Sequence, residues 1–396
     1  MLSTLTAVLL LLAGIVVLLG LVIAVVRGVR VARTRRAARL IAGPRRALLT
    51  LLADDDPEAA DHLVALPERT WQATQPTAVA LLGKIRGEAR DGLLDVFERR
   101  GVTATALRDL RRPGRVRRAR AAEALGNLGR REAVPRLCAM LAGEDPEARV
   151  VAVRALGRIG DPAAAGPLLA SLSAAEPTPS QLVAHALVQL GPDAVPSLTD
   201  ALRHPDALVR VTALDALGLL GAAAGTGVVA EVLRDDPDPD VRSAAAATLG
   251  RLGAPGGLTP LLAALAPTEP TALRVAAARA LGELGAAAAV EPLGELLHDP
   301  QYRVAHEAAH ALRRLGPAGW AQLRRQAEAP GAGERTGPSA AAADATASPA
   351  TALDAPGTRQ AGPASAAAHA EEALALLAVM EEPTHPEPTP ALAVGR

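Results

Sequence analysis

The segment VRSAAAATLGRLG, residues 241–253, decides the fold because close variants of it recur along the chain. One leucine recurs every 30 to 32 residues. In all seven copies a second apolar residue lies three positions after this leucine, and a glycine comes directly after that residue. Self-similarity at such a period is the sequence signature of a repeat protein. The aligned leucines are Leu125, Leu156, Leu187, Leu217, Leu249, Leu281 and Leu312, and the closing glycines are Gly129, Gly160, Gly191, Gly221, Gly253, Gly285 and Gly316.

Each repeat is predicted to be a pair of helices. The apolar residues of the first segment recur at helical spacing, and a closing glycine with positive φ ends that helix. A second apolar segment follows, such as AVPRLCAMLAG at 133–143, where Pro135 lies near the helix start and its missing N–H is harmless. One pair cannot bury its apolar faces alone, so we predict that neighbouring pairs stack into an all-α solenoid.

A column of arginines follows the turns between repeats, which are rich in Asp and Glu. We expect each guanidinium to reach carboxylates or carbonyls at the end of the preceding unit, which would tie the repeats together. The column consists of Arg118, Arg149, Arg210, Arg242 and Arg274.

The repeated units resemble HEAT repeats, specifically the bacterial phycobilisome-lyase-like type with the helix pattern VRxxAAxALGxLG. The resemblance covers seven repeats in residues 117–327, and it implies a right-handed superhelix of helix pairs with an extended concave face that holds another protein. Residues 44–116 continue it as a degenerate helical N-terminal part of the solenoid. In that part Leu82–Ile85 fit the register, and Trp71 is expected to pack as an apolar anchor.

The N-terminal segment has the character of a membrane anchor. Residues 4–26 carry no charge, and as a helix they are about 35 Å long, enough for a hydrocarbon core of about 30 Å. Eight arginines follow in residues 27–46. The positive-inside rule therefore places the N-terminus outside and the solenoid in the cytoplasm. We predict a single-pass plasma-membrane protein in which residues 1–43 form the anchor and its basic flank, and Arg27–Arg46 contact anionic lipid.

The composition excludes some classes of protein. Lys+Arg and Asp+Glu are balanced at 42 each, which argues against a dedicated nucleic-acid binder. The single cysteine, Cys138, rules out an intrachain disulfide and fits a reducing compartment. No glycine-rich phosphate loop opens a helix, and no cofactor is expected.

A basic segment at residues 107–123 is the candidate binding site. It would suit a phosphate, a lipid headgroup or an acidic protein partner, and the alternative is a solvated face paired with nearby carboxylates. Its seven arginines are Arg108, Arg111, Arg112, Arg115, Arg117, Arg118 and Arg120.

The stretch His306-Glu307-Ala-Ala-His310 fits the H-E-x-x-H pattern of zinc metalloproteases. Two histidines at i and i+4 share one helix face, but no third ligand follows in the sequence. The pair also resembles the His-Glu motifs of deoxyhypusine hydroxylase, a di-iron HEAT-repeat enzyme. That enzyme needs such pairs in several repeats, and the equivalent positions here hold other residues. We therefore predict no catalytic residue and no metal ligand, with His306, Glu307 and His310 as the alternative candidates.

From residue 328 to 396 the chain is rich in Ala, Pro, Gly, Ser and Thr, which predicts a disordered tail. Within it, residues 369–382 have helical spacing and would fold onto a partner, onto the solenoid itself, or only transiently. The sequence as a whole predicts a non-catalytic, membrane-anchored scaffold that binds a protein at the cytoplasmic face of the membrane. A metal-dependent oxidoreductase and a lyase-like assembly factor are the alternatives.

Overall fold

The computed structural model describes residues 27, 43–53, 56–143, 145–174, 177–328 and 366–381. Within these residues the regular structure is helical, as predicted, and there is no strand. None of the described helices is long and apolar enough to cross a membrane. The predicted anchor at residues 4–26 lies outside the described residues, as do 329–365 and 382–396 of the predicted tail. The chain divides into two compact units, residues 1–161 and 162–396.

The first unit is built around a small aromatic core. Trp71 and Phe97 meet edge to face with ring centroids 5.5 Å apart, and both are buried with Leu63 and Leu93. Trp71 is thus the apolar anchor that its sequence context predicts. The helices are residues 43–53, α2 (Pro57–Ala65), α3 (Glu68–Leu82), α4 (Glu88–Arg99), α5 (Val102–Arg111), α6 (Arg115–Leu128), α7 (Val134–Leu141) and α8 (Pro146–Ile159).

Upstream of the regular repeats, α3 packs against α6, as consecutive first helices of repeats do further on. The α3 helix ends at Leu82, so the rest of the segment Leu82–Ile85, which fits the repeat pattern, lies beyond the helix. Gly83 has a negative φ of −74°. The positive φ occurs instead at Gly87, four residues later. The α5 helix is an addition to the two-helix plan, and it packs on both α4 and α6.

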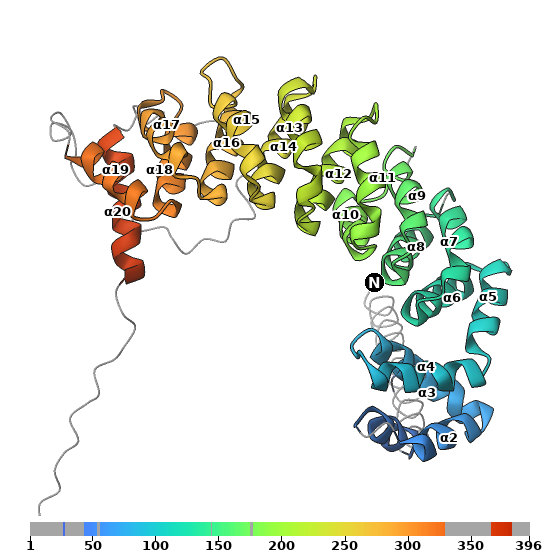
Figure 1. Ribbon diagram of the computed structural model, residues 1–396. Coiled ribbons are helices and arrows are strands. Elements are labelled where there is room, and N and C mark those ends of the chain that lie inside the picture. The colour runs from blue at the N-terminus through green and yellow to red at the C-terminus, as the bar shows by residue number, and fades with distance from the viewer. Residues whose placement is uncertain are drawn as a thin grey trace, which may run out of the picture. The chain divides into compact units, whose positions relative to one another are not determined.

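The second unit consists of helix pairs in two layers. Figure 1 shows α10, α12, α14, α16 and α18 in one layer and α11, α13, α15 and α17 in the other. The pairs are α10 (Ser180–Gln189) with α11 (Val195–Ala201), α12 (Ala207–Leu220) with α13 (Thr226–Asp235), α14 (Pro239–Leu252) with α15 (Leu258–Ala263), α16 (Thr271–Leu284) with α17 (Val290–Glu295), and α18 (Tyr302–Arg314) with α19 (Pro317–Ala327). The unit begins with α9 (Ala165–Ala170) and ends with α20 (Ala366–Glu381).

The ends of the first helices are determined by local chemistry. All seven closing glycines have positive φ, between 62° and 81°, which confirms the prediction made from the repeats. At the other end, Asp145, Asp206 and Asp238 each accept a hydrogen bond from the backbone N–H two residues on, as N-cap residues do. The chain between the paired helices makes a short 3-10 turn, for example at Pro255–Gly257.

The first helices approach each other closely because small residues face each other. A Cβ added to Gly282 of α16 would lie 2.8 Å from the Cα of Ala311 in α18, and Gly250 of α14 has the same relation to Ala280 of α16. Contacts between neighbouring first helices are more extensive than contacts between second helices. The second unit therefore bends toward its first-helix layer.

Three members of the arginine column, Arg210, Arg242 and Arg274, tie repeats together, but their carboxylate partners differ from the expectation. Arg210 donates to the His204 and Pro205 carbonyls of the preceding turn, as expected. Its carboxylate partner is Asp236, at 2.8 and 2.9 Å, which follows the second helix of the same repeat. Arg242 with Glu269, and Arg274 with Asp299, repeat this arrangement. Each of these guanidinium groups is at the start of a first helix. It lies between the turn that precedes this helix and the turn that follows the second helix of the same repeat, and so it joins both turns.

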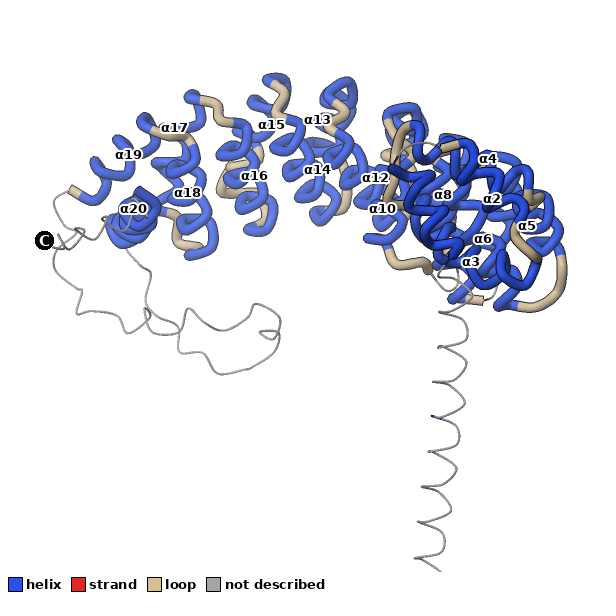
Figure 2. Tube along the Cα trace, turned by 90° about the horizontal axis from the view of Figure 1, so that it is seen from below, coloured by secondary structure: helices blue, strands red, loops and turns tan. Residues whose placement is uncertain are grey.

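Beyond residue 328, the part of the predicted tail that the structure describes is one helix, residues 366–381. This helix, α20, packs against α18 and α19, and Figure 2 shows it nearly end-on beside α18. Ala367, Ala370 and Ala373 are buried on its inner face. Small side chains at three-residue spacing let the helix lie close to the last repeat, an arrangement that corresponds to folding onto the solenoid, one of the three sequence-based interpretations.

Candidate functional site

The basic segment divides between two helices, so its arginines do not form one patch. Arg108 on α5 bonds within its own helix, to the Ala104 carbonyl, and Arg112 lies 3.8 Å from Asp109. Arg115 of α6 pairs with Asp145 at 3.2 Å. Arg111 is exposed, and Arg118 is half-buried.

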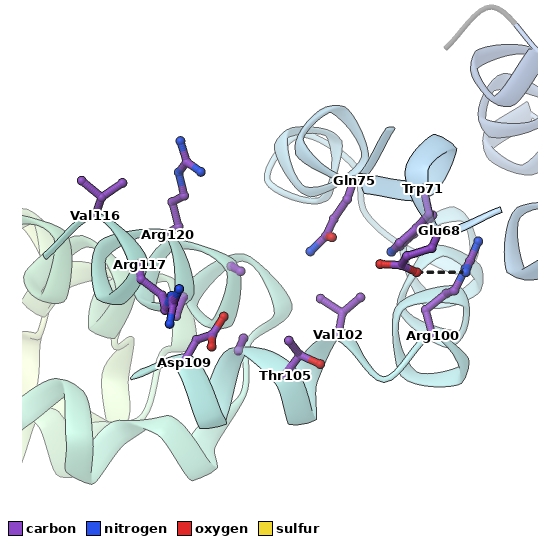
Figure 3. A pocket seen from close by; sticks show the side chains of 13 residues that line it. Glu68, Trp71, Gln75, Arg100, Val102, Thr105, Asp109, Val116, Arg117 and Arg120 are labelled. Carbon is purple, nitrogen blue, oxygen red and sulfur yellow. Dashed lines mark ion pairs between the residues drawn. The ribbon is translucent and has the colours of Figure 1, made fainter. Parts of the chain in front are cut away.

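The remaining two arginines, Arg117 and Arg120, line a cleft of about 470 Å³ between α3, α5 and α6. Figure 3 shows Val116, Arg117 and Arg120 of α6 on one side, facing Glu68, Trp71 and Gln75 of α3, with Val102 and Thr105 of α5 between them. Ala106, Ala121 and Ala124 complete the small apolar lining.

The two sides of the cleft differ in how well their charges are neutralised. On the α3 side, Arg100 lies 4.8 Å from the centre of the Trp71 ring and 3.8 Å from the Glu68 carboxylate. On the α6 side, the exposed Arg117 and Arg120 have no hydrogen-bond or ion-pair partner among the described residues. Beside them Val116 is 66% exposed. The α6 side thus offers two available cations next to an apolar side chain.

A second hollow, of about 650 Å³, lies in the second unit between α15, α16 and α17. Its main charged groups are already paired, because Arg274 binds Asp299 and also donates to the Leu265 carbonyl. A wall with neutralised charges has little basis for selecting a charged ligand. The cleft of the first unit is therefore the better candidate.

Glu307 is buried in an ion-pair network and does not act with His306 as a ligand pair. Arg279 of α16 binds its two carboxylate oxygens at 3.1 and 2.8 Å, and Arg314 lies 3.7 Å away. Burial acts to raise the pKa of Glu307, but the Arg279 hydrogen bond and both positive charges outweigh it and hold the pKa below its ordinary value. The carboxylate is therefore ionised and occupied by the two arginines.

His306 and His310 lie close together one helical turn apart, with ring centroids separated by 4.5 Å. Tyr302 stacks on His306 at 5.4 Å, and His369 of α20 contacts both rings. Burial, followed by the nearby charge of His306, lowers the pKa of His310 and of His369. Both imidazoles are thus neutral at pH 7. His310 is half-buried.

Sequence reasoning did not identify the α3 residues of the cleft, or His369 and Glu372 of α20, as partners of these sites. Each belongs to a helix distant in sequence, so no spacing pattern connects it to Arg117 or His306. Cys138 is half-buried, and burial followed by the charge of Asp161 raises the pKa of its thiol. It is therefore protonated at pH 7 and a poor nucleophile.

The helix pairs, the packing of neighbouring first helices and the buried ion pairs of the arginine column together define a helical repeat scaffold. The sequence profile of HEAT repeats matches residues 103–189, 165–250, 195–271 and 258–329, which together cover more than half of the chain. The chain belongs to the HEAT-repeat proteins. The comparison with curated proteins found no match.

Solved structures with related folds are distant in sequence. An engineered protein is 20% identical over 72% of this chain and 94% of its own, with a TM-score of 0.34. Human deoxyhypusine hydroxylase in complex with glycerol is 21% identical over 69% of this chain and 98% of its own, with a TM-score of 0.29. The karyopherin Kap121p bound to the SUMO protease Ulp1p is 13% identical, with a TM-score of 0.47, and 73% of this chain spans 38% of its length.

Proposed function

We propose that this protein is a membrane-anchored scaffold whose HEAT repeats bind a protein partner at the cytoplasmic face of the membrane, and that binding rather than catalysis is its role. The observation that supports this most directly is the cleft between α3, α5 and α6, where Arg117 and Arg120 have no side-chain partner in the described part of the chain and Val116 is 66% exposed. Arginine binds carboxylates in a bidentate manner, and exposed apolar surface beside it adds contact area.

The chemistry of the cleft favours an acidic segment that also carries an apolar side chain. Its carboxylates would pair with Arg117 and Arg120, and its apolar group would pack on Val116 and the alanines of the lining. Nucleic acid is a weaker candidate, because a phosphate backbone needs an extended basic surface, whereas Lys+Arg and Asp+Glu are balanced at 42 each in this chain.

A photo-cross-linker at position 116 of the full chain, in membranes of the cells that produce it, tests this proposal. We expect a discrete cross-linked protein that is lost in the double variant Arg117→Glu/Arg120→Glu. The matched control is Arg131→Glu/Arg136→Glu, which makes the same charge change at two exposed arginines outside the cleft. Equal cross-linking in both double variants would contradict the proposed site.

A second control distinguishes binding at this cleft from non-specific binding along the solenoid. Leu219 on α12 is exposed to a similar extent, at 58%, and lies in the other unit. A cross-linker there should not yield the same product. If it does, the partner binds along the array, and the scaffold role stands without the proposed cleft.

The membrane component is tested independently of the partner. Residues 4–26 are uncharged and long enough to span a bilayer, and eight arginines follow them. We expect the full chain to resist carbonate extraction from membranes and the variant lacking 4–26 to be released. Added protease should reach the repeats only when the cytoplasmic face is open, and digestion from the other face would reverse the proposed topology.

A further inference from the structure

One group of potential metal ligands stands out in the described part of the chain. His306 of α18 and His369 and Glu372 of α20 each offer one ligand atom, and these atoms all lie within 4.8 Å of one another. The group joins the last HEAT repeat to the helix of the tail, two segments that the sequence separates widely.

The spacing on both helices suits a shared ligand. His306 and His310 are four residues apart on α18, and His369 and Glu372 are three apart on α20, so each pair projects from one face of its helix. These two faces meet, since the Nδ1 atom of His306 lies 3.6 Å from Oε2 of Glu372. Metal sites built between facing helices use pairs of this kind.

The distances are close to those of a zinc site. With bonds of about 2.1 Å to nitrogen and oxygen, two ligands of a tetrahedral Zn²⁺ lie about 3.4 Å apart. The His306–Glu372 separation of 3.6 Å is near this value. The Glu372 side chain is 51% exposed, so it is free to rotate and close the remaining distance.

The surroundings also resemble a ligand site. His369 is only 2% exposed, so its imidazole has lost nearly all contact with water. Burying a polar ring costs free energy unless its nitrogens find partners, and a metal ion bound to one nitrogen is such a partner. The Tyr302 ring lies 5.4 Å from that of His306 and 5.0 Å from that of His369, and it covers one side of the group.

We propose that His306, His369 and Glu372 bind a divalent transition metal ion, with Zn²⁺ the best match to this donor set, and that the ion fastens α20 to the last repeat. Imidazole and carboxylate ligands together suit Zn²⁺ rather than Mg²⁺ or Ca²⁺, which prefer oxygen alone. The role is structural, because the three ligands come from two helices that the ion would hold together. Glu307 takes no part, since Arg279 and Arg314 occupy its carboxylate.

The test is a titration of the full chain, purified in detergent without a polyhistidine tag and stripped of metal, with Zn²⁺ in competition with a chromogenic chelator. We expect one equivalent of Zn²⁺ to bind. In His369→Gln and in His306→Gln the affinity should fall by more than the roughly 10- to 100-fold that loss of an outer partner costs a metal site. His185→Gln is the matched control, because His185 is exposed on α10 and its side chain bonds only to Gln189 in the described chain.

Two further measurements keep the proposal falsifiable if a histidine variant undocks α20. Glu372→Gln removes a ligand at an exposed position, and it should weaken Zn²⁺ binding while α20 stays docked. Co²⁺ should give the absorption spectrum of a tetrahedral site with nitrogen and oxygen ligands. Absence of stoichiometric Zn²⁺ binding overturns the proposal, and so does unchanged affinity after deletion of 366–396, since the His306–His310 pair would then account for the binding alone.

Discussion

At the residue scale, the closest approaches between helices depend on the absence of a side chain. A Cβ at Gly282 would meet Ala311 at 2.8 Å from its Cα and 2.9 Å from its Cβ, with the backbone of α18 unable to move aside as a side chain can. Glycine is otherwise unfavourable within a helix by about 1 kcal/mol relative to alanine. Its presence there is explained by the contact between helices rather than by helix formation.

Gly282→Ala should therefore lower the free energy of unfolding by about 1–3 kcal/mol, the typical cost of overpacking. Gly227→Ala in α13 is the matched control, because a Cβ there meets no atom within 4 Å. It should be neutral or stabilising by up to about 1 kcal/mol. Denaturant unfolding of the two variants measures both values, and equal effects would mean that α16 and α18 lie further apart than described.

Glu307 gives a pH-dependent prediction at the same scale. Its pKa is held below the ordinary value, so its contribution to stability is present above the unfolded-state pKa of about 4.3 and is lost as the pH falls through the lower folded-state pKa. Glu307→Gln should cost about 1–2 kcal/mol at pH 7, a modest value because Arg279 and Arg314 remain partly solvated.

Unfolding of wild type and Glu307→Gln at a series of pH values checks this expectation. The two curves should converge on the acid side, where both side chains are uncharged. Glu283→Gln, at an exposed position on α16, is the control and should show little difference at any pH. A gap between wild type and Glu307→Gln that widened on acidification would contradict the ion-pair explanation.

At the element scale, the arginine column distinguishes buried from exposed ion pairs. The Arg210 and Asp236 side chains are 9% and 6% exposed, whereas those of Arg251 and Asp215 are 33% and 44% exposed at a similar distance of 2.9 Å. Removing one partner of a buried pair leaves an uncompensated charge, which costs about 3–5 kcal/mol, and an exposed pair contributes about 0–1 kcal/mol.

Arg210→Ala should thus be strongly destabilising and Arg251→Ala nearly neutral. Hydrogen exchange locates the effect, and we expect faster exchange in α12 and in the turn after α13 in Arg210→Ala. The double variant Arg210→Met/Asp236→Leu should recover much of the loss, because it removes both charges together. Similar losses in Arg210→Ala and Arg251→Ala would show that the column is not an internal tie.

The helix pairs were predictable because their determinants are local. Helical spacing, a glycine that ends each first helix and a period of about 31 residues all lie within one repeat. The α5 helix lies in the part predicted to be helical, but its place as an additional helix was not predicted, because that place depends on contacts with α4 and α6. The docking of α20 likewise follows from alanines that suit α18 and α19, a match that no local pattern reveals.

The candidate sites show the same division. Sequence reasoning located the arginine-rich segment, but helix direction and Asp145 determine that only Arg117 and Arg120 reach the cleft. The H-E-x-x-H pattern pointed to α18, which contributes His306 to the proposed metal site, but the other ligands of that site are not those of the pattern. Glu307 lies between two arginines, and the further ligands for His306 come from α20, beyond the Ala/Pro-rich segment.

At the scale of the whole molecule, a repeat array needs its ends covered, because a terminal repeat has a neighbour on one side only. The α20 helix supplies the missing neighbour for α18 and α19 by burying Ala367, His369, Ala370 and Ala373. Deletion of 329–396 should therefore loosen the last repeat and leave distant ones unchanged, since each repeat contacts only its neighbours. In hydrogen exchange, α18 and α19 should exchange faster, and α10 to α14 should keep their wild-type rates.

Deletion of 382–396 alone is the control for this prediction, because it shortens the chain and keeps α20. It should reproduce wild-type exchange in α18. Removing the metal from the intact chain should produce part of the effect of the larger deletion, in α18 and α20 together, because the alanine contacts would remain. Faster exchange spread evenly over α10 to α19 would mean that the array unfolds as one cooperative body, and unchanged exchange in α18 would mean that α20 does not cover the end of the array.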